Sequence, residues 1–129
     1  MVLDTSALMA LLLDEPEAES FRLALEHDAV RLVSSATLLE TALVIETRKG
    51  EAGGRELELL IHKADIVVVP ADEAQVSEAR RAFRRFGKGR HPAALNYGDL
   101  FAYALARTSG EPLLFKGDDF ARTDIARVT

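Results

Sequence analysis

The chain has 129 residues, 48% of them hydrophobic and 29% charged, with no cysteine and a formal net charge of −5. This size and composition predict one globular domain over residues 1–129, and they exclude disulfides, thiolate metal sites and an intrinsically disordered chain. The longest apolar runs are far shorter than the ~20 residues that span a bilayer, and no basic segment precedes the first, so we expect a cytoplasmic protein without membrane contact.

Strands and helices are predicted to alternate from end to end. Because each crossover between parallel strands needs a dozen or more residues, this alternation predicts an α/β fold with a mostly parallel sheet of four to five strands and helices on both faces. The strands are expected at 2–3, 30–33, 66–69 and 113–115, with a short strand or tail at 125–128, and the helices at 6–13, 16–26, 36–49, 53–63, 72–86 and from about 97 to 108.

Two of these elements are predicted to be buried. The strand at 66–69 is a continuous β-branched run, which is typical of a strand covered on both faces. The helix at 36–49 is apolar almost all round, yet it contains Glu40. A capping box with Thr37 is one explanation. Since Ser34 and Ser35 are better placed to cap, the alternative is that Glu40 lies further along the helix and binds a metal ion.

A basic zone lies in the second half of the chain. No acidic residue occurs between positions 79 and 98, and the helix at 72–86 keeps its apolar residues at helical spacing with arginines on the other face. Solvated surface is the simpler explanation, whereas a flexible basic loop after Gly87 favours contact with phosphates. We therefore predict RNA binding by Arg80, Arg81, Arg84, Arg85, Lys88 and Arg90.

Acidic residues are predicted to meet at the carboxyl edge of the sheet, where parallel α/β folds place their ligands. Carboxylates without a positive partner repel one another by up to ~4 kcal/mol per close pair, so they need a cation. Oxygen ligands select Mg²⁺ or Mn²⁺, and the three histidines have no zinc spacing. Asp99 also has a local explanation, as a first-turn acid in a helix capped by Asn96. The candidates are Asp4, Glu40, Asp99 and one of Asp118 and Asp119.

Four segments, in order and spanning nearly the whole chain, resemble a PIN-domain ribonuclease of the VapC toxin type. The resemblance implies an α/β/α sandwich, Mg²⁺-dependent cleavage of RNA, often tRNA or ribosomal RNA, a homodimer, and inhibition by a small antitoxin. The segments are Asp4-Thr5-Ser6, Glu40 within Leu-Glu-Thr-Ala, Asn96-Tyr97-Gly98-Asp99, and residues 113–120.

The resemblance assigns Asp4, Asp99 and Glu40 as catalytic metal ligands. Many members of the family carry a fourth acid where this chain has Gly117, so that role passes to Asp118 or Asp119.

Between these two, we favour Asp118 because it lies nearer the end of the strand at 113–115. Asp119 would then support it structurally, since it precedes Phe120, whose ring should pack inward, or it would cap a local turn.

Three other readings remain to be weighed. A haloacid-dehalogenase phosphatase needs a second Asp where Ser6 stands, and a receiver domain needs an acceptor Asp where the 66–69 strand runs into Pro70. A catalytically silent PIN-like module that only binds a partner protein is the remaining alternative. The joint presence of the three expected metal ligands argues against it.

Overall fold

The computed structural model describes residues 1–128, so Thr129, the last residue of the expected domain, lies outside the described residues. Within them, four strands form one sheet in the order β3-β2-β1-β4, and each neighbouring pair is parallel. The strands are β1 (Val2–Leu3), β2 (Leu32–Ser34), β3 (Val67–Val69) and β4 (Leu113–Leu114); the helices are α1 (Thr5–Leu12), α2 (Ala18–His27), α3 (Ser35–Lys63), α4 (Glu73–Phe86), α5 (Tyr97–Ser109) and the short 3-10 helix η1 (Phe120–Arg122).

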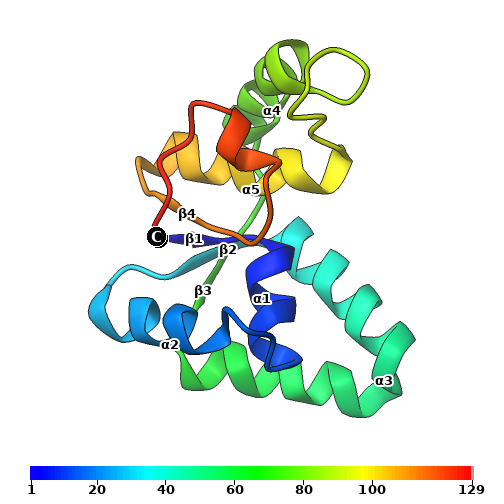
Figure 1. Ribbon diagram of the computed structural model, residues 1–129, viewed down its shortest axis with the longest axis vertical. Coiled ribbons are helices and arrows are strands. Elements are labelled where there is room, and N and C mark those ends of the chain that lie inside the picture. Colours follow the sequence, from blue (N-terminus) through cyan, green and yellow to red (C-terminus); the bar gives the residue numbers. More distant parts are fainter. Residues whose placement is uncertain (129) are drawn as a thin grey trace.

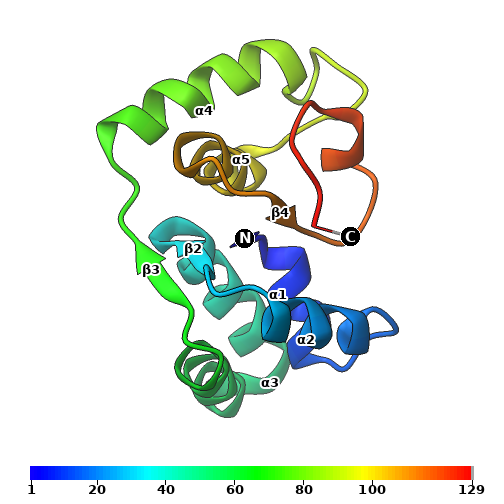
Figure 2. The same ribbon diagram turned by 90° about the vertical axis from the view of Figure 1, so that its left-hand side faces the viewer.

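The molecule is a three-layer α/β/α sandwich, as predicted. Helices α4 and α5 cover one face of the sheet, and α1, α2 and α3 cover the other (Figures 1 and 2). Successive residues of β1 point to opposite faces, so Val2 packs into the core under α4 and α5 while Leu3 packs against α1 and α2. Because all strands are parallel, their carboxyl ends lie along one edge, and β1 is one of the two central strands there.

Helix α3 joins the two helices that were predicted over 36–49 and 53–63. It bends at Gly50, whose φ of 65° and ψ of −159° are not helical. The predicted break is therefore correct, but the helix resumes at once, and Figure 1 shows its two halves meeting at an angle. Residues from both halves of the bent helix line one concave surface.

Two predictions of burial are wrong. Strand β3 is an edge strand that pairs only with β2, and Val67 and Val68 are 56% and 40% exposed. Helix α3 is not buried all round, because Leu39 and Leu43 are 61% and 60% exposed. These errors share a cause: the order of strands in the sheet is not encoded locally, and the same apolar run suits a central strand or a partner-binding surface.

Two of these exposed residues, Leu39 and Val67, line a groove of about 1000 Å³, which we call the α3 groove. It runs along the inner side of the bend in α3 and reaches the first residue of β3. Its apolar lining includes Leu38, Leu39, Leu57, Ile61, Ile66 and Val67.

The remaining elements lie within a few residues of their predicted positions. The strand expected at 30–33 lies slightly later, at Leu32–Ser34, and the expected final strand at 125–128 is a single parallel bridge between Leu113 and Arg127. Among the described residues, no helix is long and apolar enough to cross a membrane.

Candidate active site

Asp4 leaves β1 at the carboxyl edge of the sheet, as predicted. Its backbone N–H donates to the carbonyl of Leu114 on β4 at 3.1 Å, which extends the ladder to this residue. Its side chain then caps α1, because Oδ2 accepts from the Ser6 N–H at 3.0 Å and from the Ser6 hydroxyl at 2.7 Å. Asp4 is only 5% exposed, so strand and cap together fix a nearly buried carboxylate.

Ser6 also fixes the loop after β4. Its Oγ accepts the backbone N–H of Lys116 at 3.0 Å while its hydroxyl donates to Asp4. One hydroxyl therefore ties the first acid to the segment that carries Asp118 and Asp119.

Glu40 lies near the start of α3 and faces the start of α1. Its Oε1 accepts from the Thr5 hydroxyl at 2.7 Å, and the Thr5 oxygen accepts in turn from Thr41 at 3.1 Å. The capping box with Thr37 is not formed, because Ser34 caps α3 by accepting from Ala36 N–H. The position of Glu40 within the helix is thus the one that the metal-ligand interpretation requires.

Asp99 belongs to a capping box at the start of α5. Asn96 Oδ1 accepts from the Asp99 N–H, and Asp99 Oδ2 accepts from the Asn96 N–H, both at 2.9 Å. The local explanation for Asp99 is therefore correct. It does not exclude a functional role, since the capping box uses only one carboxylate oxygen.

Gly98 is what lets α5 approach Glu40. A Cβ atom at this position would lie 2.1 Å from Glu40 Oε2 and 2.7 Å from its Cδ. Any side chain here would displace the Glu40 carboxylate, so the glycine allows the start of α5 to lie directly against this acid.

The three acids share one feature. Each carboxylate is fixed through one oxygen, and among residues 1–128 its other oxygen accepts no hydrogen bond. The free oxygens are Asp4 Oδ1, Glu40 Oε2 and Asp99 Oδ1.

Burial and mutual repulsion raise the pKa values of two of these acids. Desolvation, with smaller contributions from the charges of Asp4, Asp119 and Glu40, raises the pKa of Asp99 to about 6, although the hydrogen bond from Asn96 lowers it. Desolvation also raises the pKa of Asp4, with a smaller contribution from Glu40. This edge of the sheet therefore concentrates negative charge.

The last two candidate acids face different surroundings. Asp119 lies close enough to Asp99 to raise its pKa, and its side chain makes no capping hydrogen bond to η1. Asp118 instead lines a groove with Phe21 and Gly117 beside α2. This placement points to Asp119, against the preference for Asp118 that its nearness to the strand suggested. Phe120 packs inward, as expected, and is 2% exposed.

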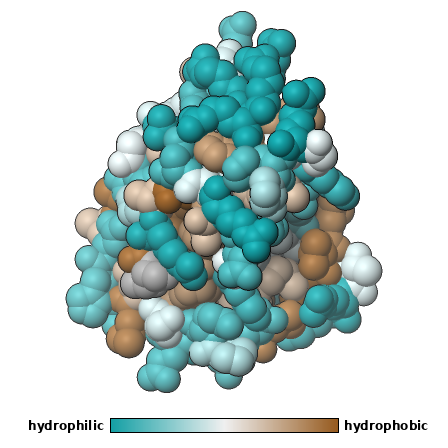
Figure 3. Space-filling model, turned by 45° about the horizontal axis from the view of Figure 1, so that its top comes forward, coloured by the Kyte–Doolittle hydropathy of each residue, from teal (hydrophilic) through white to brown (hydrophobic). Residues whose placement is uncertain are grey.

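The predicted basic residues lie on α4 and in the loop that follows it. This end of the molecule is mostly hydrophilic in Figure 3. Arg81 forms an ion pair with Glu78 at 2.7 Å, and Arg85 with Asp124 at 3.1 Å, so acids from outside the basic stretch reach into it. The other four basic residues, Arg80, Arg84, Lys88 and Arg90, form no ion pair with any described residue.

By sequence alone, Thr5 and Ser6 are equally suited to capping the first helix and to binding a carboxylate, and no pattern marks Gly98 as a site residue. The structure gives both hydroxyls to carboxylates, while Asp4 does the capping. The two hydroxyl residues directly after Asp4 were the feature of the sequence that indicated contacts with carboxylates. Nothing local in the sequence showed that Gly98 meets Glu40.

A parallel sheet whose carboxyl edge gathers acids from β1, α3 and α5 defines a class of α/β proteins with an acidic, oxygen-lined site. The chain belongs to the PIN-domain family, whose model matches residues 1–126.

Its relatives within that family carry VapC names. It is 62% identical to Ribonuclease VapC30 of Mycobacterium tuberculosis, over 99% of this chain and 98% of that protein. It is 59% identical to Ribonuclease VapC of Mycolicibacterium smegmatis, over 99% of each chain.

Solved structures confirm the fold. The crystal structure of VapC20 of M. tuberculosis, described as a toxin that cleaves the sarcin-ricin loop, aligns with a TM-score of 0.78 at 17% identity, over 97% of this chain and 95% of that one. VapBC2 from Rickettsia felis, bound to a promoter DNA fragment, aligns with a TM-score of 0.76 at 13% identity, over 98% and 94% of the two chains.

Proposed function

We propose that this protein is a Mg²⁺-dependent endoribonuclease toxin that cleaves cellular RNA in the cytoplasm and is inhibited by a small cognate antitoxin. The observation that carries the proposal is the set of three anchored carboxylates, each with one free oxygen, at an edge where the pKa of Asp99 is raised to about 6. The names of the close relatives support ribonuclease activity.

The residues of the site fit a divalent cation held by oxygen ligands. Asp4, Glu40 and Asp99 offer carboxylate oxygens without a lysine or histidine between them, which suits Mg²⁺, with Mn²⁺ as a second fit. Among residues 1–128, no three acidic or histidine side chains already stand at the spacing of one shared ion. Binding would draw the carboxylates together against the repulsion that raises their pKa values.

A bound Mg²⁺ would polarise the scissile phosphate and lower the pKa of the attacking water. The chain's own residues do the positioning. Ser6 and Thr5 fix the directions of Asp4 and Glu40, and the α5 capping box fixes Asp99. We assign the role of the fourth acid, which accepts a proton or orients water, to Asp119, because its charge acts on Asp99.

The direct experiment is cleavage of total tRNA and ribosomal RNA by the purified protein, with 5′ ends mapped by sequencing. We expect cuts that need Mg²⁺, stop with EDTA, and fall at least about a hundredfold in Asp99→Asn. Glu78→Gln is a matched control, because Glu78 is an acid of α4 that pairs with Arg81 far from the candidate ligands. Cleavage that persists in EDTA, or at wild-type rate in Asp99→Asn, would contradict the proposal.

The partner is proposed to bind the α3 groove. The VapBC structures show that relatives of this fold assemble with a partner chain. The groove has an apolar, exposed part and is about 1000 Å³ in volume, so a small antitoxin would bury Leu39 and Val67 there. We also propose a homodimer, as is implied by the resemblance to the family.

Expression alone should stop growth, and co-expression with the neighbouring small gene should restore it and co-purify both chains. Leu39→Glu should weaken that complex, whereas Leu23→Glu, at a similarly exposed leucine of α2 outside the groove, should not. Growth unaffected by an active enzyme, or equal loss of the complex in both variants, would contradict this assignment.

A further inference from the structure

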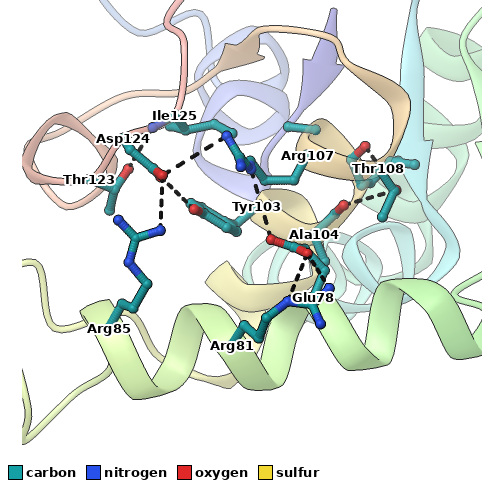
Figure 4. A network of polar contacts seen from close by, with 12 residues as sticks. Glu78, Arg81, Arg85, Tyr103, Ala104, Arg107, Thr108, Thr123, Asp124 and Ile125 are labelled. Atoms are coloured by element: carbon teal, nitrogen blue, oxygen red, sulfur yellow. Dashed lines mark hydrogen bonds and ion pairs between the residues drawn. The ribbon is translucent and has the colours of Figure 1, made fainter.

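The basic residues of α4 fall into two sets that differ in their partners. On one flank, Arg81 pairs with Glu78, and Arg85 pairs with Asp124 at 3.1 Å. Figure 4 shows Arg85 and Arg107 converging on Asp124, which also accepts the Tyr103 hydroxyl. These arginines are neutralised within the fold and tie α4 to α5 and to the C-terminal segment.

The other flank has cations without acids. Three arginines line a groove of about 530 Å³ between α4 and α5, and among the described residues none of them forms an ion pair. The volume lies within the roughly 300–1,000 Å³ typical of small-molecule sites. The groove that we call the aromatic groove is lined by Arg80, Arg84, Arg90, Phe83, Tyr97 and Phe101.

Three aromatic rings line this groove, those of Phe83, Tyr97 and Phe101. Tyr97 is 79% exposed and Phe83 is 37% exposed. The rings of Tyr97 and Phe101 are nearly perpendicular, with 4.9 Å between their centroids. Arg90 lies over the Phe83 ring at 5.0 Å. Exposed rings between unpaired cations are the combination that binds bases by stacking and backbone phosphates by charge.

The groove adjoins the acidic site through α5. Tyr97 is the first residue of that helix, and Asp99 lies two residues further on in the same turn. Between them, Gly98 is the residue that touches Glu40. The aromatic groove and the acidic site therefore both include residues of the first turn of α5.

We propose that the aromatic groove is a nucleotide subsite, which stacks one unpaired base of single-stranded RNA on Tyr97 and holds the neighbouring phosphate with Arg84 and Arg80. This inference rests on the proposed ribonuclease function. A second copy of the chain is the rival occupant, but a two-fold contact joins the same surface of both copies, and no acid lines this groove to pair with the arginines of the other copy. Charge complementarity therefore favours a polyanion.

The test is binding of a short unstructured oligoribonucleotide that carries 2-aminopurine, measured without Mg²⁺ so that no cleavage occurs. Stacking should quench the 2-aminopurine fluorescence on the wild-type protein. Tyr97→Ala should abolish the quenching and weaken binding on the order of tenfold, whereas Tyr97→Phe should keep both. Arg84→Ala should lower the salt dependence by about 0.7 in the log–log slope, and Arg81→Ala, the matched control on the paired flank, should not.

These measurements test the nucleotide subsite separately from the proposed ribonuclease function. Cleavage by the wild type with unchanged binding and quenching in Tyr97→Ala and Arg84→Ala would overturn the subsite and leave the ribonuclease intact. A change from dimer to monomer in Tyr97→Ala, by sedimentation velocity, with unchanged RNA affinity, would assign the groove to a contact between copies and also overturn it. Arg84→Ala keeps the test decisive if Tyr97→Ala does not fold.

Discussion

Two charged regions of this molecule are built in opposite ways. In the acidic site, Asp4, Glu40 and Asp99 lie together, and desolvation and like charges raise the pKa of Asp99 to about 6. In the network between α4, α5 and the C-terminal segment, burial also opposes the charge of Asp124. There a hydrogen bond from Tyr103 and the charges of two arginines lower its pKa below the usual range.

The contrast separates charge that stabilises the fold from charge that the fold tolerates. The Asp124 network is satisfied internally, so it should matter for stability and little for chemistry. The acidic site is strained by repulsion, and its hydroxyl and amide partners hold the carboxylates in direction without neutralising them. Such strain persists where a ligand relieves it. The predictions below test this division.

The largest effect is expected from Gly98→Ala. A Cβ 2.1 Å from Glu40 Oε2 would push that carboxylate off its Thr5 hydrogen bond. Because the atoms that this Cβ would meet are at the flexible end of the Glu40 side chain, the free energy of unfolding should change by only about 1 kcal/mol. The displaced carboxylate should nevertheless reduce the cleavage rate about a hundredfold. Cleavage rates and urea unfolding measure both.

Gly54→Ala is the matched control, since Gly54 lies in the second half of α3 and its Cβ would meet only the flexible Glu46 side chain at 3.0 Å. It should leave cleavage unchanged. Equal cleavage in Gly98→Ala and wild type would show that the position of Glu40 is not critical.

A smaller loss is expected from Asp119→Asn. Its charge acts on Asp99, so removing it should reduce turnover roughly tenfold with little change in melting temperature. Asp118→Asn, one residue away but facing the groove beside α2, should retain nearly full turnover. Paired cleavage and melting experiments that give the reverse pattern would exchange the two roles.

Within the Asp124 network, Tyr103→Phe should lower stability without lowering activity. The ring is 1% exposed and its hydroxyl donates to Asp124. Losing this buried hydrogen bond should cost about 1–2 kcal/mol of unfolding free energy. Tyr97→Phe removes a hydroxyl from a side chain that is 79% exposed and should cost almost nothing. A large loss of cleavage in Tyr103→Phe would contradict the assignment of the Asp124 network to stability alone.

The smallest effect is a pH dependence from Asp99. Its pKa is about 6 in the folded state against 3.8 for a free aspartate carboxyl, so the folded protein binds the proton more tightly than the unfolded chain does. The stability that this proton contributes is present at pH 4 and is lost as the pH rises through 6. After discounting for partial exposure, the loss is about 1 kcal/mol and should be absent in Asp99→Asn. Urea unfolding at pH 4, 5, 6 and 7 measures it.

The sequence predicted what depends on local pattern and failed where distant segments meet. The position of Asp4 at the carboxyl edge was predicted correctly because a strand end fixes where the next residue emerges. The capping of α5 by Asn96 followed from three residues in a row. The edge position of β3 was missed because a run of valines is equally compatible with the centre and the margin of a sheet. The contact of Gly98 with Glu40 joins two helices that are remote in sequence, so no local pattern could show it.

The central claim is that the acidic site holds a divalent cation, and one pair of proteins tests it directly. Urea unfolding of wild type and Asp99→Asn is measured at pH 7, first without Mg²⁺ and then at MgCl₂ concentrations that rise in tenfold steps. Without Mg²⁺, Asp99→Asn should be the more stable protein, because a repelling charge is gone. With Mg²⁺ the wild type should gain stability with the logarithm of the concentration and overtake the variant, which should gain little. A wild type that is more stable than Asp99→Asn without Mg²⁺, and whose stability Mg²⁺ does not change, would contradict the account.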